Sequence, residues 1–387
     1  MLALLFYRQN RDFEAMQFFE KAYLIDDSCL TMNQVYANCL IRNNENELAD
    51  KISKKIIQEN PDNTEMLKVL AISSFNSGNL QAAEQYVIRV LQQEPDNMDF
   101  ILLRAKILMK KGEYLNVSSL LDVYARNDNT NKDYLLLRAE LQRDWNKNIS
   151  SASSTMQIAL NLYPDDIDIL LMAASIMATS RQKIGQRTLK DVLDTILQKE
   201  PENAQAQELL ISEYINSENW NDAYNLSSTL INKNNYSTEI LLQHIKSCIQ
   251  MGLASEARNS INLLKTMKIE SSLLELATVQ VLIAEGKKAE AFSLIQRAIS
   301  IYSGKAKSDF YYEKSRISAN EEEKLSDLRL SLTANPRNPD ALFSLYKYYF
   351  DKADYRKAQY YLRQVVALNP ENSKLTELNA QLDSLIK

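Results

Sequence analysis

The chain has 387 residues, of which 45 are lysine or arginine, 50 are aspartate or glutamate and one is histidine. The formal charge of −5 argues against nonspecific binding to nucleic acid or to an anionic membrane surface, because either needs an excess of positive charge. Six glycines and seven prolines leave no flexible linker, and three cysteines without a C-x-x-C pair favour neither a disulfide framework nor a zinc site.

Prolines and glycines recur along the chain with a period near 34 residues. Four pairs are separated by 34 residues, namely Pro61 and Pro95, Gly78 and Gly112, Gly252 and Gly286, and Pro336 and Pro370. Proline cannot continue a helix because it lacks an N–H group and clashes with the preceding turn, and glycine tolerates the positive φ of a tight turn. Each therefore ends a helix, and the period indicates a stack of helix–turn–helix repeats.

The segment 64–97 is the clearest repeat. Its first helix presents Leu67 and Leu70 on one face, residues 77–79 form the turn, and the second helix presents Ala83 on its apolar face. This pattern resembles the tetratricopeptide repeat, whose second helix carries a small residue in a fixed position. In this register the small residue recurs as Ala15, Ala49, Ala83, Ala152, Ala223, Ala257, Ala291 and Ala358. The equivalent positions of three other units hold Val117, Leu189 and Lys324.

The resemblance covers essentially the whole chain. It implies an all-α fold, a right-handed α-solenoid (superhelix) of about 11 tetratricopeptide-like helix–turn–helix repeats that forms one domain over residues 1–372. The expected units are residues 1–29, 30–63, 64–97, 98–131, 132–166, 167–203, 204–237, 238–271, 272–305, 306–338 and 339–372. Irregular spacing predicts joints with few interhelical contacts, and therefore hinges, at residues 145–150, 181–187 and 302–307.

Residues 373–387 are predicted to form a C-terminal capping helix. Leu375, Leu378, Leu382 and Leu385 recur at the three- and four-residue spacing of one apolar face. The solenoid thus ends on a helix whose other side is polar. We expect no comparable cap at the N-terminal edge, which leaves that edge available for self-association.

The apolar start, residues 1–7, does not read as a signal peptide, because no basic residue precedes it and no cleavage-like sequence follows. No stretch of the chain approaches the length of a membrane span. In the repeat register Met1 lies inside a first helix, so we expect the native protein either to extend upstream of Met1 or to begin with a short helix. The default compartment is cytoplasmic, and the alternative is periplasmic or membrane-anchored if an upstream signal has been removed.

No catalytic constellation is visible in the sequence. The single histidine, His244, lies at a position that faces a neighbouring helix and is interpreted as a packed side chain. Without a second histidine or a suitable cysteine partner, neither a Ser/His/Asp nor a Cys/His arrangement is expected. No G-x-G-x-x-G or G-x-x-x-x-G-K-[ST] motif is present. We therefore expect a protein that is not an enzyme, with no cofactor and no metal.

The family resemblance implies that first helices line a concave groove. Carried onto this sequence, the fifth and ninth positions of the units form an apolar row beside a polar one. The residues expected to contact a partner are Leu102, Lys106, Leu136, Leu171, Leu242, Lys246, Leu276, Lys314, Phe343 and Lys347. Leucines at one-repeat spacing beside lysines suit an extended or helical partner segment with apolar anchors and acidic residues. The alternative is that each leucine packs against the adjacent first helix.

Two functions remain open at this point. The first is a non-catalytic protein–protein interaction scaffold that binds a protein or peptide partner in the groove, and the alternative is a docking or regulatory region of a larger enzyme or envelope/secretion assembly whose active part lies upstream or in another subunit. The carboxylate clamp of chaperone-binding relatives is not expected, because Lys68 is followed by Ile72 where that clamp has asparagine. RNA-binding pentatricopeptide arrays have a similar period, but the acidic balance and leucine-rich groove argue against nucleic acid as a partner.

Overall fold

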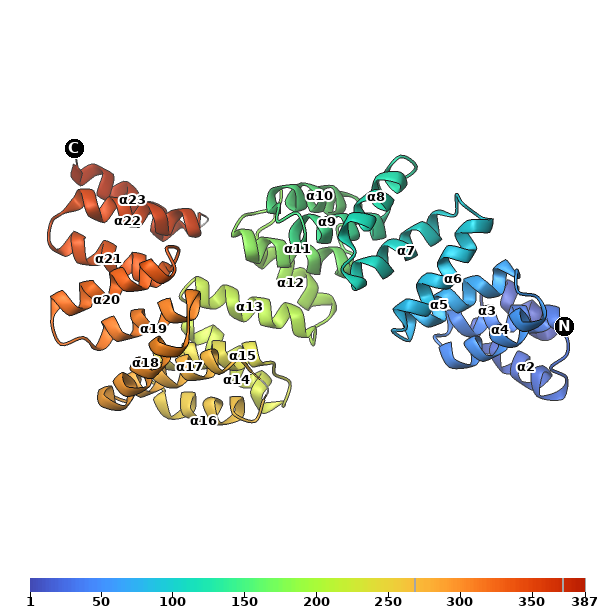
Figure 1. Ribbon diagram of the computed structural model, residues 1–387, viewed down its shortest axis with the longest axis horizontal. Helices are drawn as coiled ribbons and strands as arrows, with labels where there is room; N and C mark the ends of the chain where they lie inside the picture. Colours follow the sequence, from blue (N-terminus) through green and yellow to red (C-terminus); the bar gives the residue numbers. More distant parts are fainter. Residues whose placement is uncertain (268, 371, 387) are drawn as a thin grey trace. The chain divides into compact units, whose positions relative to one another are not determined.

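The computed structural model describes residues 1–387 except residues 268, 371 and 387. Its described part contains 23 α-helices and no β-strand, with one isolated bridge between Ile184 and Arg187 (Figure 1). The chain divides into two compact units, Met1–Pro164 and Asp165–Lys387. This division falls at none of the three joints expected from irregular spacing. The all-α solenoid prediction is confirmed, whereas the boundaries of the individual repeats stay a prediction.

The first unit is a succession of helices in which each packs against the next, and the first helices α3 and α5, and α7 and α9, also contact one another. Its helices are α1 (Leu2–Arg8), α2 (Asp12–Ile25), α3 (Leu30–Arg42), α4 (Asn46–Glu59), α5 (Thr64–Asn76), α6 (Leu80–Gln93), α7 (Met98–Lys111), α8 (Tyr114–Ala125), α9 (Lys132–Asp144) and α10 (Ile149–Leu162).

The second unit follows the same plan, and its first helices α11, α13, α15, α17 and α19 contact one another in sequence. Its helices are α11 (Ile167–Ser180), α12 (Leu189–Lys199), α13 (Ala204–Asn216), α14 (Trp220–Asn232), α15 (Thr238–Gln250), α16 (Ala254–Leu264), α17 (Ser271–Ala284), α18 (Lys288–Ile301), α19 (Gly304–Ile317), α20 (Glu321–Ala334), α21 (Pro339–Asp351), α22 (Tyr355–Leu368) and α23 (Ser373–Ile386). None of the helices in the described part of the chain has the length and apolar composition to cross a membrane.

The turn inside each helix pair explains the spacing of the glycines. Gly78 and Gly112 adopt φ angles of 77° and 78°, a left-handed conformation that costs glycine no Cβ clash. Several other pairs place a residue with a side chain in the same conformation, namely Asn44, Arg181, Glu218 and Ala353. For such residues the left-handed conformation costs about 1–2 kcal/mol, so the turn geometry is imposed by helix packing and glycine is the residue that fits it best.

The connection between pairs explains the spacing of the prolines. After Pro61, Pro95, Pro201 and Pro336, the residue two positions on is an asparagine that begins the next first helix. The side-chain oxygens of these asparagines, Asn63, Asn97, Asn203 and Asn338, accept hydrogen bonds from backbone N–H groups of the first turn. Such capping satisfies donors that lack a partner within the helix and stabilises it by about 1 kcal/mol. Proline thus ends one helix, and asparagine starts the next.

The small residue of the second helix lies at the closest contact between the helices of a pair. All eight predicted alanines have a relative exposure of 0%. Ala83 of α6, for example, packs in one cluster with Leu67 and Ala71 of α5. Among the three exceptions Val117 is also fully buried, whereas Lys324 of α20 is exposed.

The segment predicted to form the cap contains helix α23, and its role as a cap stays a prediction. Leu382 is 1% exposed and packs with Tyr346, Ala358 and Leu362. Leu375 and Leu378 cover the same cluster, as expected. Leu385 does not, because it is 50% exposed and Ile386 takes its place against the core. Residue 387 of the predicted cap lies outside the described residues.

At the N-terminal edge, large apolar side chains are exposed, including Leu2, Leu5 and Phe13. Phe6 stacks on the ring of Phe18 with 5.5 Å between ring centroids, which ties α1 to α2. Self-association through this edge stays a prediction.

Replacing Ala83 by arginine should lower the free energy of unfolding by about 3 kcal/mol or more, because the site has no space for the side chain and no partner for its charge. Gln85→Arg is the matched control, since Gln85 is exposed on the same helix, and it should change stability by less than about 0.5 kcal/mol. Urea denaturation followed by circular dichroism measures both. Equal stability of the two variants would mean that the repeat register is wrong.

Leu382→Asp should destabilise the end of the second unit by about 3 kcal/mol, because it places a carboxylate in an apolar cluster. Leu385→Asp tests the same chemistry on the exposed side of α23 and should have little effect. Thermal unfolding and light scattering distinguish them, and deletion of residues 373–387 should reproduce the Leu382→Asp phenotype with added self-association. If deletion of residues 373–387 changed neither the melting temperature nor the self-association, α23 would not act as a cap.

Candidate functional site

Three of the predicted groove residues lie in the first unit. Leu102 of α7 is only 4% exposed, so it belongs to the core of the unit, contrary to the expectation that it faces a partner. The Nζ atom of Lys106 lies 2.9 Å from a carboxylate oxygen of Asp133 in the first turn of α9, so its charge is already balanced within the fold. Leu136 of α9 is half-buried. In this unit the row therefore contributes mainly to packing between helices.

The apolar members of the row in the second unit are partly accessible. Leu171 of α11, Leu242 of α15 and Leu276 of α17 are each half-buried. Leu242 covers the cluster around Leu241 and Ile245, and Leu276 covers another cluster that includes Val279. Leu242 and Leu276 thus pack against the core with part of their surface and leave the rest exposed to solvent.

The lysines of the second unit divide into two kinds. Lys246 and Lys347 are exposed, and the Nζ atom of Lys347 lies 4.7 Å from the centre of the half-buried Phe343 ring. Lys314, in contrast, lies 2.7 Å from a carboxylate oxygen of Asp327, whose side chain is 4% exposed. Lys314 is therefore a counter-ion for a buried acid. The expectation that it contacts a partner conflicts with this placement, because removing it from Asp327 would leave that charge uncompensated.

A buried polar network surrounds α19. Glu313 accepts hydrogen bonds from Gln280 of α17 at 2.8 Å and from Arg316 at 2.8 Å. Burial raises the pKa of Glu313, and Arg316 opposes the shift. Asp309 accepts from the amide of Asn338 at 3.0 Å, and burial raises its pKa to about 6. These hydrogen bonds join α17 to α19, and α19 to the start of α21.

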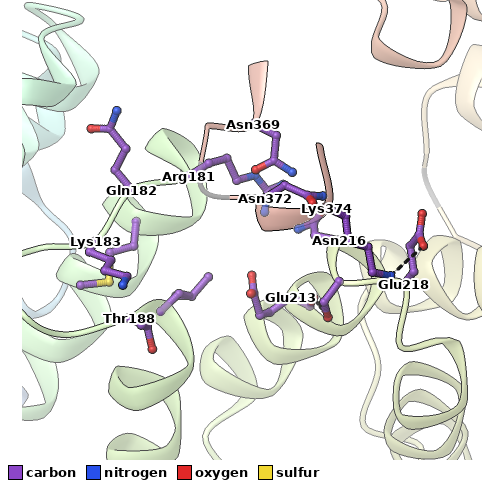
Figure 2. A pocket seen from close by; sticks show the side chains of 13 residues that line it. Arg181, Gln182, Lys183, Thr188, Glu213, Asn216, Glu218, Asn369, Asn372 and Lys374 are labelled. Atoms are coloured by element: carbon purple, nitrogen blue, oxygen red, sulfur yellow. Dashed lines mark hydrogen bonds and ion pairs between the residues drawn. The ribbon is translucent and has the colours of Figure 1, made fainter. Parts of the chain in front are cut away.

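A cavity of about 280 Å³ opens in the second unit between the α11–α12 connection, the end of α13 and the α22–α23 connection (Figure 2). Burial lowers the pKa of Arg181 and raises that of Glu213, and each charge opposes the shift of the other. Lys374 closes one side through an ion pair of 3.1 Å with Glu218 (Figure 2). The sequence marks residues 181–187 only as a joint, because the groups that line the cavity come from segments far apart in the chain.

His244 is buried on α15 and stacks on Tyr224 with 5.3 Å between ring centroids. The sequence predicts no cysteine partner for it, but the structure places Cys248 Sγ 3.3 Å from His244 Nε2. A Cys–His pair therefore exists. Burial raises the pKa of the Cys248 thiol to about 12, whereas a nucleophilic cysteine needs a lowered pKa and access to substrate. The pair does not have the properties of a catalytic dyad.

No family model and no curated protein sequence matches the chain. Solved structures do. The crystal structure of the APC/C hetero-tetramer Cut9-Hcn1 is similar over 90% of this chain and 80% of that chain, with 13% identity and a TM-score of 0.50. A tetratricopeptide repeat protein from Parabacteroides merdae ATCC 43184 matches 70% of this chain and 98% of that chain, with 15% identity and a TM-score of 0.46. The crystal structure of yeast Tom70 matches 99% of this chain and 94% of that chain, with 12% identity and a TM-score of 0.41. With its period and its helix pairs, the chain has the tetratricopeptide-repeat fold.

Stability of the second unit should depend on the protonation of Asp309. Its pKa is about 6 in the folded protein and 3.8 ordinarily, so between these values the folded state holds a proton that the unfolded state releases. The free energy of unfolding should therefore decrease as pH rises from about 4 to about 7.

Asp309→Asn should remove this part of the pH dependence and raise stability at neutral pH, because no charge is then buried. Asp194→Asn, at an exposed position of α12, is the control. Thermal melts over this pH range report both. A profile that is the same in Asp309→Asn and in the unmodified protein would contradict the assignment.

Proposed function

We propose that this chain is a non-catalytic protein-interaction scaffold whose second unit binds an extended or helical segment of a protein partner along its first helices. The observation that carries the proposal is that Leu171, Leu242 and Leu276 of the first helices are half-buried, while Lys246 and Lys347 of other first-helix positions are exposed. Leu242 and Leu276 are already fixed by packing on one side, so contact with a partner removes further apolar surface from water with little loss of side-chain freedom.

The proposed surface contains fewer residues than the surface expected from the sequence. Leu102, Lys106 and Lys314 are used inside the fold, whereas Phe343 and Lys347 on α21 present an aromatic face with a cation above it. Leu242 and Leu276 are one repeat apart and provide neighbouring anchors, whereas Leu171 lies two repeats before Leu242. The two exposed lysines favour a segment that carries acidic residues. A protein or peptide of this composition is the partner class that the surface fits.

The apolar part of the surface is tested by the double variant Leu171→Asp/Leu242→Asp. It should lose the partners that the unmodified protein captures from cell extract, quantified by mass spectrometry and then by titration of the purified partner. Because both leucines are half-buried, the variant should melt at a moderately lower temperature, and Leu102→Asp should be the more destabilised of the two proteins.

The matched control is Phe292→Asp/Leu330→Asp, which changes two exposed apolar residues of the second helices α18 and α20. It should retain the partners. Loss of the same partners in this control, or their retention in Leu171→Asp/Leu242→Asp, would move the binding surface to the second helices.

The charged part is tested by Lys246→Glu and Lys347→Glu. Each should weaken the binding of an acidic partner by about 1 kcal/mol, roughly fivefold in Kd, and the unmodified complex should weaken as salt increases. Lys106→Glu is the contrasting variant, since that lysine is paired with Asp133, and it should alter stability more than affinity. Salt-independent binding would contradict the electrostatic part of the proposal.

A further inference from the structure

Three side chains of metal-ligand type converge between α14, α15 and α16, away from the proposed binding row. His244 and Cys248 are one turn apart on α15, and Glu256 lies in the first turn of α16. One potential ligand atom from each of the three lies within 4.8 Å of the other two. His244 and Cys248 are buried and Glu256 is partly accessible.

Hydrogen bonds fix which nitrogen of His244 is available. The Ser227 hydroxyl donates to the carbonyl oxygen of Ala223 at 2.6 Å and lies 2.9 Å from His244 Nδ1. When the one proton of that hydroxyl is given to Ala223, Nδ1–H donates to the Ser227 oxygen and the lone pair belongs to Nε2. A metal-binding histidine is oriented in the same way, with its other ring N–H held by a polar group.

The spacing of the ligand atoms suits a tetrahedral ion. Bonds of about 2.0–2.1 Å to nitrogen and about 2.3 Å to sulfur place the two atoms roughly 3.5 Å apart. His244 Nε2 and Cys248 Sγ are 3.3 Å apart. The Glu256 carboxylate is the third candidate ligand, because one of its oxygens lies within 4.8 Å of both atoms. It accepts a hydrogen bond of 2.5 Å from the hydroxyl of Tyr224.

The site also has an access route. A cavity of about 170 Å³ adjoins it and is lined by Tyr224, Ser228, His244, Glu256 and Asn259, among others. Such a volume holds water that can serve as a fourth ligand. Three protein ligands and an open position form a common zinc arrangement.

We propose that His244 Nε2, the Cys248 thiolate and the Glu256 carboxylate bind Zn²⁺, with a water from the cavity as the fourth ligand. Binding breaks the S–H bond of Cys248, the proton leaves to solvent and the sulfur lone pair coordinates the ion. Nitrogen, sulfur and oxygen ligands together suit zinc, whereas Mg²⁺ and Ca²⁺ prefer oxygen alone. The ion ties α15 to α16 and does not depend on the proposed partner surface.

Co²⁺ is the probe, because it occupies zinc sites and reports its ligands spectroscopically. The metal-free, full-length protein titrated with Co²⁺ should bind one equivalent, with a thiolate-to-cobalt charge-transfer band and the visible bands of a four-coordinate site, and Zn²⁺ should displace it. Zn²⁺ should also raise the melting temperature in proportion to the logarithm of its concentration above Kd. Absence of the charge-transfer band in the unmodified protein overturns the proposal without any variant.

Variants assign the ligands. Cys248→Ala should abolish the charge-transfer band, and Cys29→Ala and Cys39→Ala, which change the other two cysteines, should retain it. Ser227→Ala leaves all three ligands in place and should weaken affinity by about 10- to 100-fold through loss of histidine orientation. A band that persists in Cys248→Ala, or an affinity that is unchanged in Glu256→Gln, overturns the assignment.

Discussion

The close approach of the two helices in each pair is the constraint on which the rest of this structure depends. It requires a small side chain where the second helix crosses the first, and eight alanines with no exposed surface meet that requirement. Where Lys324 stands instead, the contact between α19 and α20 is made further along by Leu328 and Ser331, and buried hydrogen bonds such as that between Ser308 and Ser331 supplement the packing. Asp309 and Glu313, whose pKa values are raised by burial, lie on this same helix α19.

The same approach dictates the turns. A helix that must return closely along its predecessor needs a left-handed residue at the corner, and Gly78 and Ala353 adopt nearly the same conformation although only glycine does so without strain. Between pairs, a proline ends the helix and an asparagine caps the next. These two short devices set where the helices of a repeat begin and end.

Burial and pairing separate the residues that serve the fold from those that can serve a partner. Lys314 and Lys347 occupy equivalent positions of consecutive units, but one neutralises a buried aspartate and the other is exposed above an aromatic ring. In the same way His244 and Cys248 form a pair that would be catalytic in an accessible, electropositive setting. In a buried setting the thiol is protonated and weakly nucleophilic. The same geometry with a carboxylate nearby is better suited to holding an ion than to attacking a substrate.

The sequence by itself determined the helical class, the period, the alanine positions and most of the capping face, because turn chemistry, helix periodicity and the size of a side chain act over a few residues. The expectation that the first helices bind a partner came from the family resemblance and stays a prediction. Only the tertiary structure decided that Leu102 is core, that Leu385 is exposed, and that Lys106 and Lys314 already have carboxylate partners. The sequence shows that His244 and Cys248 are one turn apart on one helix. It does not show that Ser227 and Tyr224 of α14 and Glu256 of α16 lie next to them. Exposure, charge pairing and ligand convergence depend on neighbours that are distant in sequence, and no local pattern specifies them.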